Sequence, residues 1–390
     1  MRIFLSCLQS DARHDVPAYG FWESYFKNGL EETGHEWIEA KDVDWAQGLA
    51  AGGNGELDAW RDRAWSKTLA HIKKVQQTQS IDLFLSYLFP KQVEPTAIRE
   101  IQSWDIPCVN FFCDNVREFT RIPDVYGCFD LHWVPEFEAL EMYEEAGLDY
   151  VHAPMPCWIP PEQRVCNHPE DYAPTFIGSR DALRERLFAD ALKQDATVDL
   201  RGPGWISNGT EGESSSTFRS VIKRLPQMIA NQIQLVGEEG LGGLLNKFSY
   251  RFRPNVDERL FRGVVHEGAF GEDYVRITQQ SQITLGVNRY PSFRHSFSNP
   301  GTYSRLRDIE APMMGACYLT EWTEGLNRLY DLGREIETYR TAEELVGKIE
   351  ELRQRPEKRK QMRCAAQRRA LSEHTIGASL QSLTERLGVG

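Results

Sequence analysis

The stretch APMPCWIPPEQRVCNHPEDYAP, Ala153–Pro174, interrupts the chain of 390 residues with six prolines. Proline lacks the backbone N–H that a helix interior or a central strand requires, so this stretch predicts a connector between two domains. On both sides of it, apolar strand-like runs alternate with helix-like runs. Such alternation is typical of a parallel sheet with helices on both faces. We therefore expect two doubly wound halves.

The apolar runs place the expected elements along the chain. Before the connector, the expected strands are Arg2–Leu8, Ile81–Tyr87, Ile106–Phe112, Leu131–Val134 and Tyr150–Ala153, and the expected helices are Trp22–Gly34 and Pro95–Trp104. After it, the expected strands are Thr175–Ile177, Thr197–Arg201, Leu260–Val265, Gln282–Val287 and Ala316–Thr320, and the expected helices are Ala182–Leu192, Ala342–Leu352, Glu357–Leu371 and Ile376–Leu387.

This order predicts an α/β fold of two facing Rossmann-like domains with a central cleft. The first domain is expected at residues 1–165 and the second at 166–373, with a C-terminal helix at about 374–390 packing back on the first. Ligands of such sheets bind at the carboxyl ends of the strands, so we expect the site in the cleft.

Residues of about 209–254 do not fit the alternation. The segment opens with the polar run GTEGESSS and then mixes Arg and Lys with apolar residues. One interpretation is a helical insertion in the second domain with a solvated basic face. The other is a membrane-surface or acceptor-binding element formed by the basic residues 219–253.

The composition limits the classes of partner. The formal net charge of −12 argues against nucleic acid, because phosphate contacts demand a basic surface. No apolar stretch approaches the ~18 residues of a membrane span, and the N-terminus resembles a strand rather than a signal peptide. We therefore expect a cytoplasmic protein, with peripheral membrane contact as the alternative. Eight scattered cysteines without a CxxC pair predict reduced structural thiols. The sequence does not indicate an oligomeric state.

The most informative segment for chemistry is FSNPGTYSRLRDIEAPMMGACYLT, Phe297–Thr320. Gly301 permits close backbone approach, and Thr302 can cap a helix that begins there with Tyr303 in its first turn. The N-terminus of a helix suits a diphosphate, because its N–H groups are unpaired and carry partial positive charge. An ordinary capped helix followed by a strand is the structural alternative.

Three charged residues extend this prediction. Arg305 and Arg307 follow within the first turns and can add charge-assisted hydrogen bonds to phosphate. Glu310 lies about two turns along, where a carboxylate can accept hydrogen bonds from ribose hydroxyls. Pro312 should kink or shorten the helix, and Gly315 should end it.

Several residues that follow expected strands are further candidates for nucleotide contacts. Each has a structural alternative as a loop, cap or surface residue. They are Gly178, Ser179 and Arg180, then Gly202 of GPGW, then His266, and finally Asn288 and Arg289.

The sequences RLRDIEAPMMGACYLTE and LYDLGREIETYRTAEELVGKIEELRQRPEKRKQMRCAAQRRALSEHT resemble the C-terminal half of the CgeB-like glycosyltransferases. These enzymes are related to glycosyltransferase family 4, which has the GT-B fold. The resemblance implies that the first domain binds the acceptor, that the second binds the donor, and that Glu310 contacts the donor ribose. Family 4 enzymes usually carry a second glutamate eight positions earlier, where this chain has Thr302.

Two loops of the first domain supply candidate catalytic residues. His14 and Asp15 follow the first expected strand, and Asp114 follows the third. In an inverting transferase, such a residue would take the acceptor proton as a general base. In a retaining enzyme that resembles family 4, a residue at Asp114 would lie near the reacting sugar carbon. The structural alternatives are a turn for Asp114 and a helix cap for Asp15.

We expect no metal and no cofactor other than the nucleotide sugar itself, because GT-B enzymes, as the resemblance implies, neutralise the diphosphate with a helix N-terminus and basic side chains. The one DxD run, Asp42–Val43–Asp44, lies in a polar stretch and is interpreted as a solvated turn.

The sequence thus predicts a hexosyl- or related transferase of polysaccharide or glycoconjugate biosynthesis. It would move a sugar from a nucleotide-sugar donor to a glycan, lipid-linked or small-molecule acceptor. A sugar-nucleotide epimerase of the same fold and a non-catalytic nucleotide- or sugar-binding protein are the alternatives.

Overall fold

The computed structural model of the chain describes residues 1–10, 12, 19–50, 54–205, 246–247, 250–251, 253 and 255–389. The candidate residues His14 and Asp15 lie outside the described residues, and so does most of the expected insertion at 209–254. Among the described residues, none of the helices combines the length and the apolar character that a membrane crossing demands.

The chain forms two compact units, and each is assembled from separate segments. Unit 1 comprises Met1–Arg164, Ser304–Met313 and Arg368–Gly390, and unit 2 comprises Val165–Tyr303 and Met314–Gln367. The first boundary falls within the proline-rich stretch. The segment Ser304–Met313, which was expected in the second domain, packs with unit 1.

Unit 1 contains a six-stranded sheet in the order β2-β1-β3-β4-β5-β6, and every neighbouring pair is parallel. This is the doubly wound order in which the chain reverses direction beside β1. The strands are β1 (Arg2–Ser6), β2 (Glu36–Ile38), β3 (Leu83–Ser86), β4 (Cys108–Phe111), β5 (Leu131–Val134) and β6 (Tyr150–His152).

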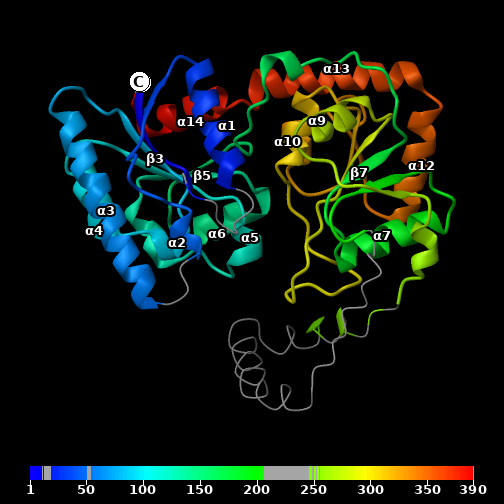
Figure 1. Ribbon diagram of the computed structural model, residues 1–390, viewed down its shortest axis with the longest axis horizontal. Coiled ribbons are helices and arrows are strands. Elements are labelled where there is room, and N and C mark those ends of the chain that lie inside the picture. Colours follow the sequence, from blue (N-terminus) through cyan, green and yellow to red (C-terminus); the bar gives the residue numbers. More distant parts are fainter. Residues whose placement is uncertain are drawn as a thin grey trace, which may run out of the picture. The chain divides into compact units, whose positions relative to one another are not determined.

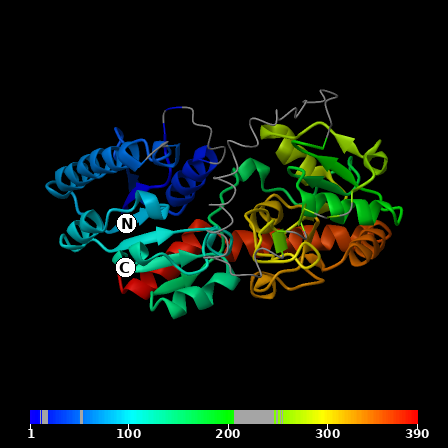
Figure 2. The ribbon, with the colours of Figure 1, turned by 90° about the horizontal axis from the view of Figure 1, so that it is seen from below.

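Eight α-helices of the described residues belong to unit 1. They are α1 (Tyr19–Glu32), α2 (Gln47–Ala50), α3 (Asn54–Gln76), α4 (Pro95–Gln102), α5 (Asn115–Glu118), α6 (Leu140–Glu145), α10 (Arg307–Met313) and α14 (Ile376–Leu387). Figures 1 and 2 show α14 in red beside α1 and the strands of unit 1, and it contacts α1, β5 and β6. The contact with α1 is close, because a Cβ on Gly29 would lie 2.5 Å from the side chain of Ile376.

Unit 2 contains a second six-stranded parallel sheet in the order β12-β11-β10-β7-β8-β9. Its strands are β7 (Thr175–Ile177), β8 (Asp199–Arg201), β9 (Val265–His266), β10 (Thr284–Gly286), β11 (Tyr318–Glu321) and β12 (Glu337–Tyr339). Its helices are α7 (Ala182–Leu192), α9 (Gly271–Gln280), α11 (Leu326–Leu329), α12 (Ala342–Arg353) and α13 (Pro356–Glu373), whose last turns belong to unit 1. Neighbouring α7 and α12 pack together (Figure 1).

The two parallel sheets with covering helices confirm the predicted α/β class. One expected strand is wrong, however. Most of Leu260–Val265 is not a strand, because Glu258–Phe261 forms a 3₁₀ turn that Asp257 caps by accepting a hydrogen bond from the Arg259 N–H at 3.0 Å. The apolar side chain of Phe261 is nevertheless buried in the core of unit 2.

The expectation that all cysteines are reduced is also wrong for one pair. Cys166 and Cys364 form a disulfide bond, and their Cα atoms lie 5.1 Å apart, within the range that a disulfide spans. Cys166 lies in the proline-rich connector and Cys364 on α13, so 198 positions separate two residues that the fold brings together. The other six cysteines are free thiols.

Candidate functional site

The carboxyl edge of the unit 2 sheet is where the topology predicts a ligand. The chain runs from β7 through β8 to β9 on one side, and from β10 through β11 to β12 on the other. The direction therefore reverses between the neighbours β7 and β10, and ligands of open α/β sheets bind at such a reversal. The loops at this point begin with Gly178 and with Val287–Asn288.

The loops after β7 and β8 are locked together by two of the predicted glycines. Gly202 has a φ of 138°, and a Cβ there would lie 2.3 Å from the carbonyl oxygen of Gly178. That same oxygen accepts a hydrogen bond from the Trp205 indole N–H at 2.7 Å. The structure therefore gives the GPGW motif a packing role that only glycine can fill at Gly202.

Ser179 and Arg180 have partners within the protein. The Arg180 guanidinium pairs with Glu185 at 2.7 Å and with Glu258 at 3.2 Å. The Ser179 hydroxyl accepts a hydrogen bond from the side chain of Arg184 at 3.1 Å. Both predicted phosphate contacts thus contribute to the structure of this loop and the start of α7.

His266 lies at the end of β9, with Nε2 3.1 Å from Oδ1 of Asp199, although the two groups are not aligned for a hydrogen bond. Asp199 is the first residue of β8, which pairs in parallel with β9. The imidazole therefore points toward the amino end of β8, away from the carboxyl edge at which a nucleobase contact was predicted.

Asn288 and Arg289, after β10, are both held by Glu321 at the end of β11. The Oε1 atom of Glu321 accepts hydrogen bonds from Nε and Nη2 of Arg289 at 2.8 and 2.5 Å. Its Oε2 atom accepts from the backbone N–H groups of Asn288 and Arg289 at 3.1 and 2.9 Å. Glu321 is 4% exposed. Arg289, predicted to contact phosphate, is thus one half of an almost buried ion pair.

The predicted helix start at Thr302 is wrong. Thr302 instead forms an antiparallel bridge with Arg289, and its hydroxyl donates to that of Thr323 at 3.0 Å. Tyr303 is buried with its ring 5.2 Å from that of Tyr290. Gly301 also packs closely, because a Cβ there would lie 2.6 Å from the His295 ring.

The helix begins five residues later, as α10, and belongs to unit 1. The Asp308 carboxylate accepts hydrogen bonds from the Ser304 hydroxyl at 2.9 Å and the Arg305 N–H at 3.1 Å, so it fixes the turn before Arg307. The helix ends one residue after Pro312, as expected, and Gly315 follows with a φ of 75°.

Glu310, on α10, is 9% exposed. Its Oε1 atom accepts a hydrogen bond from the Tyr25 hydroxyl of α1 at 2.5 Å. The predicted ribose contact is therefore held by a side chain of the same unit, a partner that the sequence does not indicate.

In unit 1, Asp114 lies between the carboxyl end of β4 and the start of α5. The adjacent residue Asn115 donates its N–H to Oε2 of Glu136 at 2.8 Å, and Glu136 follows β5, the neighbouring strand. Glu136 is completely buried, and its other carboxyl oxygen has no hydrogen-bond partner among the described residues. Burial raises the pKa of the Glu136 carboxyl to about 8, so a buried neutral acid lies next to the Asp114 loop.

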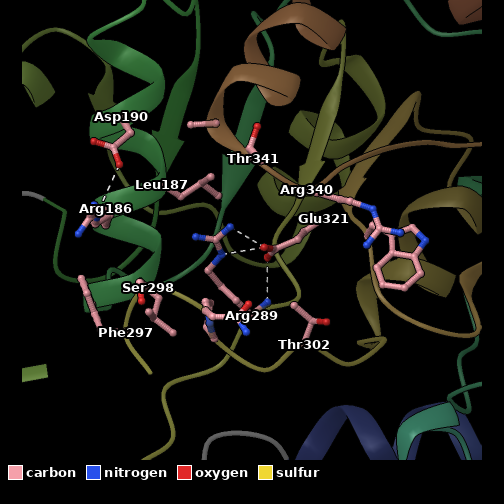
Figure 3. A pocket seen from close by; sticks show the side chains of 15 residues that line it. Arg186, Leu187, Asp190, Arg289, Phe297, Ser298, Thr302, Glu321, Arg340 and Thr341 are labelled. Atoms are coloured by element: carbon pink, nitrogen blue, oxygen red, sulfur yellow. Dashed lines mark hydrogen bonds and ion pairs between the residues drawn. The ribbon is translucent and has the colours of Figure 1, made fainter. Parts of the chain in front are cut away.

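A cavity of about 410 Å³ opens at the carboxyl ends of β10, β11 and β12 (Figure 3). This volume is in the range of small-molecule sites. Its walls come from α7, the loop before Thr302 and the start of α12. The lining residues are Leu183, Arg186, Leu187, Asp190, Arg289, Phe297, Ser298, Asn299, Pro300, Thr302, Glu321, Trp322, Arg340, Thr341 and Ala342.

The sequence prediction missed Glu136, Glu321, Trp322 and Arg340. Each lies at the end of a strand or within two residues of it, which is the one signal that could have selected them. Asp44 of the DxD run accepts a hydrogen bond from the N–H of Gln47 at 2.9 Å and so caps α2. Among the described residues, no three His, Cys, Asp or Glu side chains gather as metal ligands do.

Comparisons with known proteins agree with this architecture. Residues 215–385 match a family model described as glycosyl transferase-like. A search of curated proteins finds no match. This stretch of the chain is thus similar to glycosyl transferases, whereas the predicted closer likeness to the CgeB-like proteins and family 4 stays a prediction.

Solved structures share the fold over nearly the whole chain. A glycosyltransferase from Rickettsia africae is 13% identical with a TM-score of 0.57, and the alignment covers 99% of this chain and 97% of that one. Anabaena HepE in complex with UDP is 14% identical (TM-score 0.53, 99% of both chains). Sucrose-phosphate synthase from Thermosynechococcus elongatus is 11% identical (TM-score 0.55, 99% of both chains). The chain therefore has the GT-B fold of glycosyltransferases.

Proposed function

We propose that this chain is a glycosyltransferase that takes its sugar from a nucleotide-sugar donor. The observation that carries the proposal is the glycosyl transferase-like match at 215–385, which includes β9 to β12 and the cavity residues after them. The GT-B fold supports it. The structure of HepE with UDP makes uridine nucleotides the first donors to test.

In the proposed reaction, an acceptor hydroxyl forms a bond to the anomeric carbon of the sugar. The bond from that carbon to the diphosphate breaks, the nucleoside diphosphate leaves, and the acceptor proton passes to a base. We propose that the unit 2 loops at Gly178, Asn288 and Gly301–Thr302 hold the donor, and that Asp114 of unit 1 acts on the acceptor. The donor sugar is proposed to be a hexose or a related sugar.

Glu310 provides the first test, because the sequence predicts that it binds the ribose. We expect Glu310→Ala to weaken UDP binding at least about tenfold in isothermal titration calorimetry, about 1.4 kcal/mol, with an unchanged melting temperature. Tyr25→Phe is the matched control, since it removes the hydrogen bond to Glu310 and leaves the carboxylate in place. Equal affinities of the wild type and Glu310→Ala would refute the ribose contact.

Turnover separates glycosyl transfer from the alternatives. Wild-type protein should release UDP from UDP-glucose only when a suitable member of a glycan panel is present. Conversion of UDP-glucose to another UDP-sugar without any acceptor would identify an epimerase instead. Binding of UDP-glucose without release under any condition would identify a non-catalytic protein.

A further inference from the structure

The cavity at the ends of β10, β11 and β12 contains three arginines, and two of them are neutralised. Arg289 forms the ion pair with Glu321, at 2.5 Å, and Arg186 lies 3.3 Å from Asp190 on the next turn of α7. Figure 3 shows both pairs as dashed contacts, that of Arg186 at the left and that of Arg289 in the centre. The third arginine, Arg340, lies at the right of this view and directly follows β12.

The Arg340 side chain is held in place without an anion. Its guanidinium carbon lies 3.4 Å from the centre of the Trp322 ring, so the planar group stacks on the indole. Its backbone N–H donates to Glu344 at 2.7 Å, which fixes the start of α12. In the part of the chain that the structure describes, neither a carboxylate nor any other oxygen accepts a hydrogen bond from this guanidinium.

A guanidinium that stacks on an aromatic ring covers the ring with its flat face. Its N–H groups lie in the guanidinium plane, so their edges stay available to a ligand. The guanidinium fork matches the two oxygens of a carboxylate or a phosphate, and stacking on an aromatic ring reduces the entropy that binding would cost. The charged side chains of the lining leave one positive charge, because three arginines face only Asp190 and Glu321. Thr302 and Asn299 add polar groups to the same wall.

We propose that this cavity binds one anionic oxygen group of a substrate, with Arg340 on its Trp322 platform as the anchor. The inference rests on the proposed function, because glycosyl transfer supplies two ligands with such a group. One is the diphosphate of a nucleotide-sugar donor, and the other is the carboxylate of an acidic sugar. Both offer paired oxygens to the guanidinium fork.

The test is isothermal titration calorimetry of the full-length chain with four probes: inorganic pyrophosphate, UDP, glucuronate and, as the uncharged control, uridine. Arg340→Ala should weaken binding of the anionic ligand at least about tenfold, equivalent to about 1.4 kcal/mol. Arg340→Lys keeps the charge but loses the fork, so its affinity should be intermediate. Uridine should bind all variants alike. The matched control is Arg334→Ala, which removes an exposed arginine of the β11–β12 connection, on the other side of β12 from Arg340 and outside the cavity.

The probes distinguish the two sources of the anion and the two proposals. A loss confined to pyrophosphate and UDP assigns the cavity to the donor diphosphate, and a loss confined to glucuronate assigns it to an acidic sugar. If Arg340→Ala binds every probe as the wild type does, or if the wild type binds no anionic probe, the cavity proposal is overturned. UDP binding by the wild type, with no anionic probe responding to Arg340→Ala, would overturn it while leaving the donor proposal intact. Arg340-dependent glucuronate binding without UDP binding would do the reverse.

Discussion

Removing the Glu321 carboxylate should destabilise unit 2 strongly, and the structure indicates by how much. Glu321→Ala would leave the Arg289 guanidinium without its anion and two backbone N–H groups, those of Asn288 and Arg289, without their acceptor. Breaking a buried ion pair by removing one partner costs about 3–5 kcal/mol. Arg289 borders the cavity, where water can replace part of the lost contacts, so we expect the lower end, about 3 kcal/mol.

The assay is urea unfolding of the wild type and the variants, followed by tryptophan fluorescence, with Trp322 next to the altered residue. Glu324→Ala is the matched control, because Glu324 is exposed and lies three positions further along the same segment. Surface substitutions of that kind usually change stability by less than about 0.5 kcal/mol. A loss below about 1 kcal/mol for Glu321→Ala, compared with the control, would show that the four hydrogen bonds do not hold the ends of β10 and β11 as argued.

Three further predictions concern other features. Thiol titration of the denatured, unreduced chain should find six reactive cysteines, and eight after reduction; eight without reduction would contradict the disulfide bond. Cys364→Ser should lower the melting temperature, because a disulfide that closes a loop of this length stabilises the folded chain by up to about 5 kcal/mol. The Glu136 carboxyl has a pKa of about 8 in the folded chain and 4.5 in the unfolded chain, so the wild type loses stability as pH rises from about 5 to 8. Glu136→Gln has no such proton to lose and should become more stable relative to the wild type over this range. Parallel pH profiles of the two proteins in denaturant unfolding would exclude this. Sugar transfer, once an acceptor is found, should continue undiminished in excess EDTA, and recovery of lost activity by Mg²⁺ or Mn²⁺ would contradict the expected independence of metal.

Apolar periodicity predicted most of the strands and several helices, because the buried face of each element appears as a repeat of apolar residues within its own sequence. The expected helix Ala182–Leu192 coincides with α7. The strand Leu260–Val265 failed because an apolar run can bury Phe261 from a 3₁₀ turn as well as from a strand. The expected elements omit α3, although Trp60, Ala64 and Ile72 of its buried side lie at multiples of four positions among many charged residues.

The candidate site was harder to predict, because its partners are distant in the sequence. Nothing near Arg289 indicates that Glu321, 32 positions later, takes up its charge. The predicted helix start at Thr302 failed for a similar reason: the residue pairs with Arg289 in a bridge that the local sequence does not encode. The glycines were predicted to let a ligand come close to the backbone. A close approach is found at Gly202, but the approaching atoms belong to another loop of the protein.

The chain crosses between its two units four times, at 164/165, 303/304, 313/314 and 367/368. Neither unit can therefore be expressed as one continuous segment of the chain. A fragment that ends at Arg164 would lack α10 and α14, and would expose the face of α1 on which Ile376 packs. Exchanging unit 2 of this protein for that of a relative would require transplanting two separate pieces, 165–303 and 314–367, and leaving the ten residues between them in place. Recombination at a single point would instead combine segments of different origin within each unit of this chain.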